Sequence, residues 1–282
     1  MKNKTLLPIV AIAFSVASSV SYAAETVNIG VPSWTGAQAI ANLLKVVVET
    51  RIGGTADLVP GNNATIFQAM DQGKGDIDVH PDVWLPNQES FTKKYVDGAG
   101  TVQLSQNAYQ GDQGFCVSNN FAKANNITDI ADLGRPDVAA KMDSDGNGRG
   151  EIWIGAPGWA SANVNQVKVR DYGLLDFVEP VRAEESVKTA RVKDSITKDE
   201  GYAFYCYKPH AVWYQFDVVM LSEPSFDPAK YQMIQPSDDA DWYEKSSVAT
   251  KDALKDVQIA FSKSLESRSP AIFEFFERFS LT

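Results

Sequence analysis

The sequence has little of several residue types on which common catalytic sites depend. Its 282 residues include two histidines and two cysteines, and neither a G-x-S-x-G nor an H-E-x-x-H motif occurs. These absences disfavour serine hydrolases of the α/β-hydrolase type and zinc peptidases of the H-E-x-x-H type. We therefore expect a protein that is not an enzyme, with a secreted α/β enzyme as the alternative of another class.

Positive charge is also scarce. Lys and Arg number 26 against 36 Asp and Glu, which gives a formal net charge of -10. A surface of this sign repels phosphate backbones, so we expect no nucleic-acid partner. Hydrophobic residues make up 44% of the chain, which is ample for a packed core, and the length fits one large or two medium domains.

After the N-terminus, no apolar run is long enough to span a bilayer. Residues 1–23 combine Lys2 and Lys4, an apolar run and a small residue at Ala23, which is typical of a secretory signal cleaved after Ala23. A membrane anchor is the alternative, and the shortness of the run disfavours it. No cysteine precedes Cys116, so the usual lipid anchor is excluded. We expect a monomer that is free in the periplasm.

Strand-like and helix-like segments alternate along the chain. The strand candidates are residues 27–31, 56–60, 76–79, 114–118, 151–156, 177–181, 202–207 and 218–221. The helix candidates are residues 37–49, 64–73, 163–174 and 185–196. Such alternation predicts an α/β fold with mainly parallel sheets flanked by helices. The tail 250–279 is predicted to be helical, with Phe273, Phe276 and Phe279 facing the core.

The segments fall into two groups, so we predict a two-lobed clamshell. Lobe 1 comprises residues 24–110, lobe 2 comprises residues 111–215, and residues 216–282 return to lobe 1. The chain then crosses between the lobes near Gln110 and near Gln215. In open α/β sheets, ligands bind beyond the carboxyl ends of the strands, which here face a cleft between the lobes.

Large aromatic residues follow four of the predicted strands. They are Trp34, Trp84, Trp159 and, at the end of the fourth strand and beyond it, Tyr207 and Trp213. A methylated ammonium group has no N–H to donate, but the faces of Trp and Tyr attract its charge and pack against its methyl groups. The repeated placement predicts an aromatic box, with ordinary core packing as the alternative.

Three polar residues near these aromatics have less distinctive patterns. His210 is a candidate hydrogen-bond donor to an anionic ligand tail, with a packing role as the alternative. His80 is interpreted as a packing residue. Asp82 is interpreted as a surface-turn carboxylate rather than as a selector of cationic ligands.

Four segments carry a resemblance to a known family. VNIGVPSWTG, ATIFQAMDQGKGDIDVHPDVWLP, GAPGWASA and YCYKPHAVW resemble the substrate-binding proteins of ABC importers for glycine betaine, choline and related compatible solutes. The resemblance covers roughly the whole mature chain and implies a type II periplasmic binding protein. It implies that Trp34, Trp84 and Trp159 form the box. The family often has Trp where Tyr207 stands, so whether Tyr207 or Trp213 completes the box is left open.

The resemblance also implies a ligand class and a partner. The ligand is expected to be a methylated amine such as glycine betaine or trimethylamine N-oxide, with choline, carnitine and dimethylsulfoniopropionate as alternatives. The lobes are expected to close around it and present it to an ABC permease in the inner membrane. Such closure is a population shift between open and closed forms.

The acidic segment DSDGNGRGE matches the first half of a calcium loop. The candidate ligands are Asp143, Asp145, Asn147, Arg149 through its carbonyl, and Glu151. The usual glutamate at position twelve is replaced by Ile154. We predict a structural Ca²⁺ that braces the loop before Trp159. An acidic surface turn is one alternative, and a calcium-dependent interaction module is another.

Cys116 and Cys206 lie in two strand-like runs. An oxidising compartment permits a disulfide bond between them, but two buried free thiols are equally compatible with the sequence. Their pairing is left open.

Overall fold

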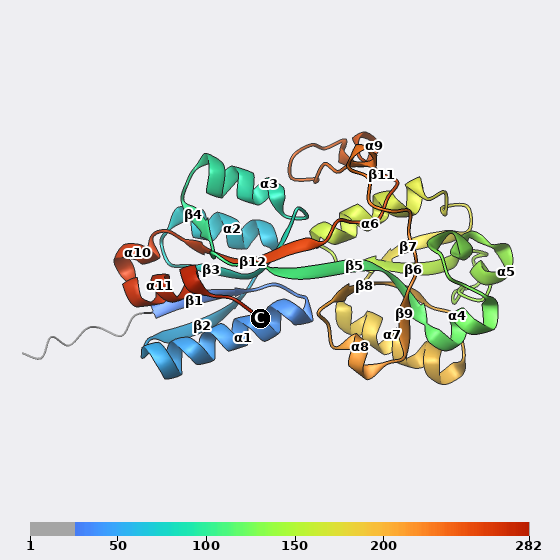
Figure 1. The fold of residues 1–282 in the computed structure, drawn as a ribbon, viewed down its shortest axis with the longest axis horizontal. Helices are drawn as coiled ribbons and strands as arrows, with labels where there is room; N and C mark the ends of the chain where they lie inside the picture. Colours follow the sequence, from blue (N-terminus) through green and yellow to red (C-terminus); the bar gives the residue numbers. More distant parts are fainter. Residues whose placement is uncertain (1–25, 282) are drawn as a thin grey trace, which may run out of the picture.

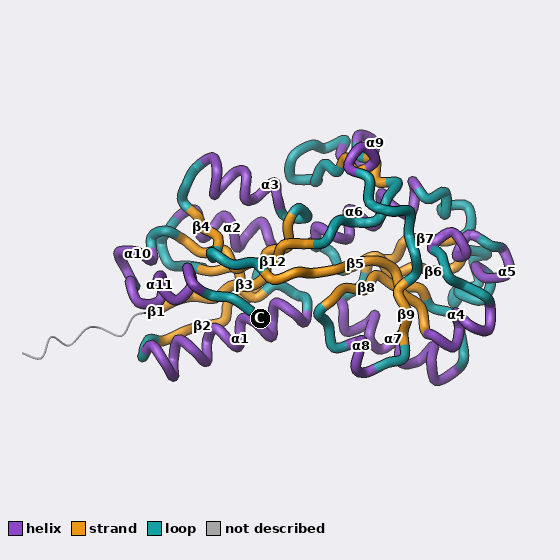
Figure 2. The backbone as a smooth tube through the Cα atoms, viewed as in Figure 1, coloured by secondary structure: helices purple, strands orange, loops and turns teal. Residues whose placement is uncertain are grey.

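The computed structural model describes residues 26–281 and shows two lobes joined by long strands (Figure 1). The predicted signal segment, residues 1–23, lies outside the described residues. Ten strands form one sheet that runs through both lobes, in the order β2-β1-β3-β12-β5-β8-β6-β7, with β4 beside β12 and β9 beside β5. Figure 2 shows these strands at the centre of the molecule and helices on either side.

The first lobe is built on the N-terminal strands. Its strands are β1 (Thr26–Val31), β2 (Thr55–Pro60), β3 (Val79–Leu85), β4 (Val102–Leu104) and β12 (Lys255–Ser262). Its helices are α1 (Thr35–Val47), α2 (Asn63–Gln72), α3 (Glu89–Thr92), α10 (Leu265–Arg268) and α11 (Pro270–Arg278). β1 is parallel to β2 and β3, whereas β12 is antiparallel to β3. α1 and α2 lie on opposite faces of this part of the sheet (Figure 1).

The local sequence explains why α1 and α2 form helices. In α1, the buried residues Ala37, Ile40 and Leu44 recur every three or four positions, so one face of the helix packs on the sheet. α2 begins with a capping box, in which the Asn62 side chain accepts from the backbone N–H of Thr65 at 2.9 Å. The cap fixes where α2 starts and therefore the position of its first residue.

The second lobe continues the same sheet. Its strands are β5 (Tyr109–Ser118), β6 (Gly150–Gly155), β7 (Val178–Arg182), β8 (Ala203–Lys208) and β9 (Val218–Met220). Its helices are α4 (Asn119–Asn125), α5 (Pro136–Ala139), α6 (Ala160–Asp171), α7 (Glu185–Lys198) and α8 (Val212–Gln215). α6 lies on one face of the sheet and α7 on the other (Figure 1). The predicted α/β fold is confirmed.

Shorter elements complete the chain. A second, two-stranded sheet pairs β10 (Tyr231–Gln232) with β11 (Ser247–Val248), and α9 (Trp242–Lys245) lies between them in the sequence. Single turns of 3₁₀ or π-helix are η1 (Val48–Ile52), η2 (Lys93–Gly98), η3 (Ile130–Gly134) and η4 (Pro228–Lys230). No helix within residues 26–281 is long and apolar enough to cross a membrane.

Two sequence predictions about local structure are wrong. The predicted helical tail begins with strand β12, in which Val257, Ile259 and Phe261 are buried at alternate positions, and only α10 and α11 are helical. This period of two is the signature of a strand. The second error concerns residues 76–79, because strand β3 starts at Val79 and continues to Leu85 through the segment that was predicted to be a loop.

The return to the first lobe also differs from the predicted boundary at residue 216. β9 pairs with β5 at Cys116–Ser118, and β11 packs against α6, so residues 218–248 accompany the second lobe. The chain re-enters the first lobe through β12, which pairs with β3 and β4. Near Gln110, strand β5 pairs with β12 at residues 109–111 and with β8 at residues 112–116, so it runs from one lobe into the other.

A covalent link joins two strands of the second lobe. Cys116 of β5 and Cys206 of β8 form a disulfide bond, with their Cα atoms 5.8 Å apart. The cysteine pairing that the sequence left open is therefore a disulfide between adjacent strands.

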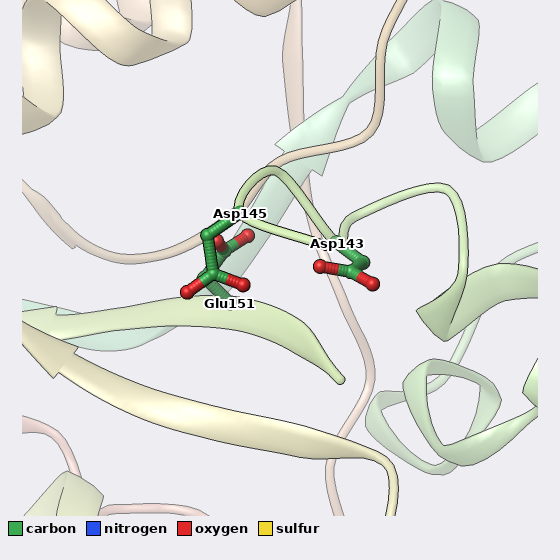
Figure 3. Close-up of side chains that lie close together, drawn as sticks. All are labelled: Asp143, Asp145 and Glu151. Carbon is green, nitrogen blue, oxygen red and sulfur yellow. The ribbon is translucent and has the colours of Figure 1, made fainter. Parts of the chain in front are cut away.

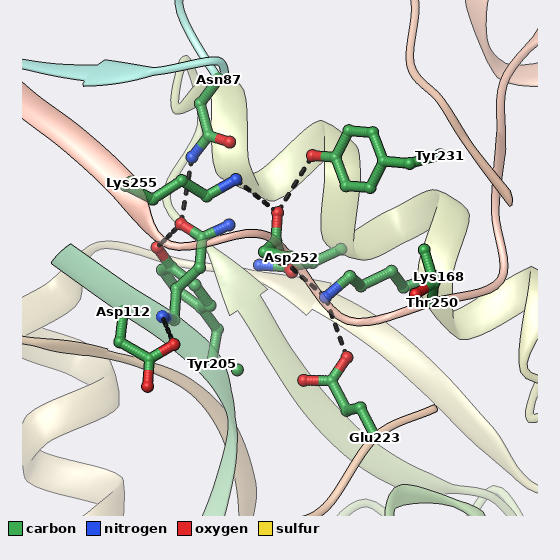
Figure 4. A network of polar contacts seen from close by, with 12 residues as sticks. Asn87, Asp112, Lys168, Tyr205, Glu223, Tyr231, Thr250, Asp252 and Lys255 are labelled. Atoms are coloured by element: carbon green, nitrogen blue, oxygen red, sulfur yellow. Dashed lines mark hydrogen bonds and ion pairs between the residues drawn. The ribbon is translucent and has the colours of Figure 1, made fainter. Parts of the chain in front are cut away.

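A buried charge network lies where the chain returns to the first lobe (Figure 4). Nζ of Lys168 lies 2.6 Å from an Asp252 oxygen and 2.8 Å from Glu223, and Nζ of Lys255 lies 2.6 Å from Asp252. The Tyr231 hydroxyl donates to Asp252 at 3.0 Å. Burial raises the pKa of Asp252, but the two ammonium groups outweigh it and hold the pKa well below its usual range. The network therefore balances two cations with two carboxylates.

Candidate functional site

A cavity between the lobes is lined by five aromatic rings. They are Trp34, Trp84, Trp159, Tyr205 and Tyr207. The first lobe supplies two of them, from the residue before α1 and from β3, and the second lobe supplies three, from the residue before α6 and from β8. Each is at most 7% exposed. Residues from distant parts of the chain thus converge on one enclosed space.

Four of the rings stand at steep angles to one another, whereas Tyr205 is stacked on Tyr207 at 29°. The centroids of Trp34 and Trp159 are 5.8 Å apart with planes at 77°, and those of Trp84 and Tyr207 are 5.5 Å apart at 83°. Trp159 and Tyr207 are 6.4 Å apart at 76°. Edge-to-face contacts of this kind are favourable between aromatic rings. They also make the rings the walls of a box rather than a single stack.

Backbone geometry brings two of the tryptophans into place. Trp159 follows Gly158, whose φ of 83° lies in the left-handed region that favours glycine. Nε1 of Trp159 donates to Oγ of Ser33 at 2.8 Å, which links the two lobes. Trp84 lies against Gly111 of β5, where a Cβ atom would approach the indole ring to 2.5 Å. Glycine at residue 111 therefore makes room for the Trp84 ring.

A buried carboxylate, Asp82, holds two of the rings from behind. Its Oδ2 accepts from Nε1 of Trp34 at 2.5 Å and from Nε1 of Trp84 at 2.9 Å, and its Oδ1 accepts from the Tyr109 hydroxyl at 2.6 Å. Asp82 is 1% exposed and lies in β3, so its interpretation as a surface-turn residue is wrong. Burial raises its pKa, and the three hydrogen bonds oppose that rise.

The partners of Asp82 are all neutral donors. Within residues 26–281, no lysine or arginine forms an ion pair with it. A carboxylate in a medium of low polarity attracts a nearby cation strongly, because little solvent screens the charge. The rings that line the cavity therefore separate it from a buried carboxyl group that has no counter-ion among these residues, and a cation in the cavity would favour its charged form.

A second buried carboxylate, Glu185, ties the lobes together behind Tyr207. One oxygen accepts from the backbone N–H and the hydroxyl of Thr35, both at 2.7 Å. The other lies 3.2 Å from the Tyr207 hydroxyl, 3.0 Å from Nε2 of His210 and 3.5 Å from Nζ of Lys188. Burial raises the pKa of Glu185, but the hydrogen bond with His210 and the charge of Lys188 outweigh it and lower the pKa to about 2. The Glu185 carboxylate, which belongs to α7, thus accepts from the first backbone N–H of α1.

The structure separates the six residues predicted for ligand binding into two groups. Trp34, Trp84, Trp159 and Tyr207 line the cavity. His210 and Trp213 do not, and instead line a separate cavity that also contains Lys208. Nε1 of Trp213 donates to the Tyr207 carbonyl at 2.8 Å, so Trp213 braces the end of β8.

Sequence reasoning missed several residues of the cavity wall. They are Asn63, Asn87, Gln88, Ala160 and Tyr205. Tyr205 was within reach, because residues two apart in a strand share a face and Tyr207 was already a candidate. The amide side chains follow a strand end and open a helix, where Asn and Gln are common for reasons unrelated to ligands.

The predicted calcium loop brings three acidic side chains together (Figure 3). One carboxylate oxygen from each of Asp143, Asp145 and Glu151 lies within 4.8 Å of the others. Groups of the loop itself already donate to all three of these side chains. The backbone N–H groups of Gly146 and Gly148 donate to Asp143, Asn147 donates to Asp145, and Ser144 donates to Glu151.

The other two predicted calcium ligands are placed differently. Oδ1 of Asn147 accepts from the backbone N–H of Arg149 at 2.9 Å, and the Arg149 guanidinium pairs with Glu179 at 2.6 Å. The hydrogen bond from Gly148 and its neighbours lowers the pKa of Asp143. The loop is compatible with a cation but is also held by its own donors, so calcium binding here stays a prediction.

Comparisons with known proteins agree with this architecture. The family model of the substrate-binding domain of ABC-type glycine betaine transport systems matches residues 25–282. No curated protein sequence matches the chain significantly.

Several solved structures share the fold at low sequence identity. A glycine/betaine/L-proline-binding protein (ProX) from Borrelia burgdorferi is 23% identical over 91% of this chain and 82% of that one, with a TM-score of 0.68. Lactococcal OpuAC, in a closed form with glycine betaine, is 18% identical over 92% and 85% of the two chains, with a TM-score of 0.68. An ABC-transporter choline-binding protein in complex with choline is 17% identical over 91% and 79%, with a TM-score of 0.66.

The family match spans nearly the whole chain, and the shared fold is the two-lobed type II fold of periplasmic binding proteins. Members of this family are solute-binding proteins that work with an ABC transporter. The chain belongs to the family of substrate-binding domains of ABC-type glycine betaine transport systems.

Proposed function

We propose that this protein captures a methylated ammonium compound in its aromatic cavity and presents it to an ABC permease in the inner membrane. The class includes glycine betaine, trimethylamine N-oxide, choline, carnitine and the sulfonium analogue dimethylsulfoniopropionate. Two structural neighbours were solved with glycine betaine and with choline, which supports the class.

The observation that carries the proposal is the pairing of five rings with one uncompensated carboxylate. Each ring face contributes about 0.5–2 kcal/mol to the binding of a desolvated cation. Asp82 adds a negative charge behind Trp34 and Trp84, and its hydrogen bonds hold both indoles in place. A neutral apolar ligand would fill the same space but leave Asp82 without a cationic neighbour.

The distribution of the rings supports closure as the mechanism. Since both lobes contribute walls, a ligand makes its full set of contacts only when the lobes are together. Glu185 and the contact between Trp159 and Ser33 add links between the lobes in this form. A ligand that binds the closed form better shifts the population towards it, and the permease would recognise that form.

The remaining parts of the proposal concern location and assembly. The signal-like N-terminus and the disulfide between Cys116 and Cys206 support export to the periplasm. We propose that the protein acts there as a monomer.

Thermal-shift measurements on the mature protein test the proposal. The panel contains methylated ammonium compounds, amino acids and sugars, each with and without a chelator. We expect the melting temperature to rise only with the methylated ammonium compounds. If cooperatively melting protein gives no shift with any of them, the cavity is ordinary core and the proposal fails.

A further inference from the structure

The polar end of the cavity contains a chain of three buried side chains. His80, Asn63 and Gln88 are at most 4% exposed, and Asn63 and Gln88 line the cavity. Nε2 of His80 lies 2.9 Å from Oδ1 of Asn63, and Nε2 of Gln88 lies 3.1 Å from the same oxygen. The direction of each hydrogen bond determines what Gln88 offers to a ligand.

The backbone fixes the direction of the first bond. The N–H of Asp82 donates to Nδ1 of His80 at 3.2 Å, so Nδ1 carries no proton and the imidazole is neutral. Burial lowers the pKa of His80 to about 3, which agrees with a neutral ring. The single ring proton therefore lies on Nε2, and His80 donates to Asn63.

The position of this proton determines the directions of the other hydrogen bonds among these three side chains. Because His80 donates, the atom of Asn63 that faces it is the carbonyl oxygen and not the amide nitrogen. The same oxygen then accepts from Gln88, so the Gln88 atom nearest to it is Nε2. The orientation of the Gln88 amide is set in this way by the backbone N–H of Asp82.

This orientation leaves Oε1 of Gln88 as an acceptor without a donor. The atom is buried and has no hydrogen-bond partner among residues 26–281. A buried acceptor in this state costs free energy, and such groups in native proteins usually have a partner in a ligand or an ordered water. Rotating the amide does not help, since Oε1 would then meet Oδ1 of Asn63.

We propose that Gln88 is a specificity-determining residue that selects a ligand whose polar end donates a hydrogen bond, such as the hydroxyl of choline. This inference rests on the proposed function and names the ligand tail that suits the site. The carboxylate of glycine betaine and the oxide of trimethylamine N-oxide only accept, so they would face Oε1 with a like partial charge. A hydroxyl donates to Oε1 and can also accept from the start of α6, where Ala160 and Ser161 line the cavity.

The neighbouring amide Asn87 does not impose the same restriction. Its Nδ2 donates to Oε1 of Gln113 at 3.0 Å, and the Tyr205 hydroxyl donates to that oxygen at 3.0 Å (Figure 4). If both amides were reversed, Gln113 would donate to Asn87 and to the hydroxyl oxygen, so the same bonds could form. Of these amides, only that of Gln88 has its orientation set by a backbone N–H, through His80 and Asn63.

Calorimetry with matched ligands tests the assignment. Choline and n-propyltrimethylammonium have nearly the same shape, but only choline has a hydroxyl. Tetramethylammonium presents the head group alone, and glycine betaine presents an accepting tail. We expect choline to bind about tenfold more tightly than n-propyltrimethylammonium, the effect of one buried hydrogen bond. We also expect choline to bind more tightly than glycine betaine.

A variant links the difference to the proposed residue. Gln88→Met keeps the length of the side chain but removes Oε1, so the ratio of the affinities for choline and n-propyltrimethylammonium should fall to about one. Gln72→Met is the matched control, because Gln72 is exposed at the end of α2 and does not line the cavity. It should keep the full preference for choline.

The outcomes separate this inference from the proposed function. Equal affinity of the wild type for choline and n-propyltrimethylammonium, or tighter binding of glycine betaine than of choline, would overturn the role of Gln88 and leave the aromatic box intact. A preference for choline that survives Gln88→Met would also overturn it. If none of the compounds binds, tetramethylammonium included, the proposed function itself is overturned.

Discussion

The charge network around Asp252 and the wall of the aromatic cavity are both buried, but they satisfy their polar groups differently. In the network, two lysines and two carboxylates face one another within 2.8 Å. In the cavity wall, Asp82 meets only neutral donors, and Oε1 of Gln88 has no partner.

The difference indicates which region holds the fold and which binds a ligand. Burying a charge or a polar group without a partner costs free energy. Unpaired groups in one buried region, beside fully paired groups in another, therefore indicate that a ligand supplies the missing partners. A cationic head with a donating tail would supply both missing partners in the cavity. In the network, each charged group already has a partner of opposite charge, so no ligand is needed there.

The largest effect is expected from breaking the balanced region. Asp252→Ala would leave Lys168 and Lys255 buried without their shared counter-charge, which should lower the free energy of unfolding by about 3–5 kcal/mol. Denaturant unfolding measures this loss. Asp239→Ala is the control, because its partner Lys245 is exposed and such pairs are worth about 1 kcal/mol or less. Similar losses in the two variants would mean that the network does not hold the fold.

Acidification should destabilise the protein through two buried groups that lie behind the cavity wall, His80 and Glu185. His80 has a pKa of about 3 when folded, against an ordinary value of 6.5. Between these values only the unfolded chain binds the proton, so stability falls as the pH drops from about 6.5 towards 3, by up to about 1.4 kcal/mol per pH unit. Glu185, with a pKa of about 2 instead of 4.5, adds a loss as the pH falls from about 4.5 to 2.

Denaturant unfolding at a series of pH values tests this dependence. His80→Gln keeps one acceptor and one donor but cannot be protonated, so its stability should change less than that of the wild type between pH 6.5 and 4.5. Identical pH profiles for the two proteins would show that His80 is not held neutral in the fold.

Removal of a ring from the cavity should weaken binding by a smaller free energy. Trp159→Ala removes a wall that meets Trp34 and Tyr207, and choline should then bind at least about tenfold more weakly, or about 1.4 kcal/mol. Trp213→Ala is a matched control from outside the cavity, and its affinity should stay near that of the wild type. A larger loss in Trp213→Ala would mean that the ligand lies in the second cavity, which Trp213 lines.

Neutralising the cavity carboxylate should have a slightly smaller effect. In Asp82→Asn, the amide oxygen can still accept from Trp34 and Trp84, and its nitrogen can donate to the Tyr109 hydroxyl oxygen. The charge is lost but the rings stay in place. Tetramethylammonium should bind about fivefold more weakly, or about 1 kcal/mol. Unchanged affinity by calorimetry would remove Asp82 from the account of cation binding.

The smallest effect concerns the acidic loop, whose carboxylates already accept from their own loop. If calcium binds there, a chelator should lower the melting temperature by about 2–4 °C, which corresponds to about 1 kcal/mol for a protein of this size. The double variant Asp143→Ala, Asp145→Ala should melt at the chelated temperature with or without calcium. If the chelator does not change the melting temperature of the wild type, the calcium prediction is wrong.

The sequence predicted the fold well where local pattern decides it. The buried stripe of α1 and the apolar runs of β1 and β8 are readable from periodicity and length. β12 was not recognised, although its buried residues alternate, because the phenylalanines of the following helix suggested one continuous helix.

The candidate site was only partly predictable. Aromatic residues at strand ends are a strong signal, and four of the five predicted aromatic residues line the cavity. Tyr207 and Trp213 could not be separated from sequence, because only the turn after β8 decides which of them faces inward. The roles of Asp82 and Gln88 depend on hydrogen bonds to residues that come together only in the folded chain, so no sequence pattern could show them.

The most direct test of the central claim compares choline with 3,3-dimethyl-1-butanol, which has nearly the same shape and the same hydroxyl but no charge. The rings and Asp82 together should favour the cation, so we expect calorimetry to show choline binding at least about a hundredfold more tightly, or about 2.7 kcal/mol. Equal affinities would show that the cavity recognises shape alone and would contradict the claim that it selects a cation.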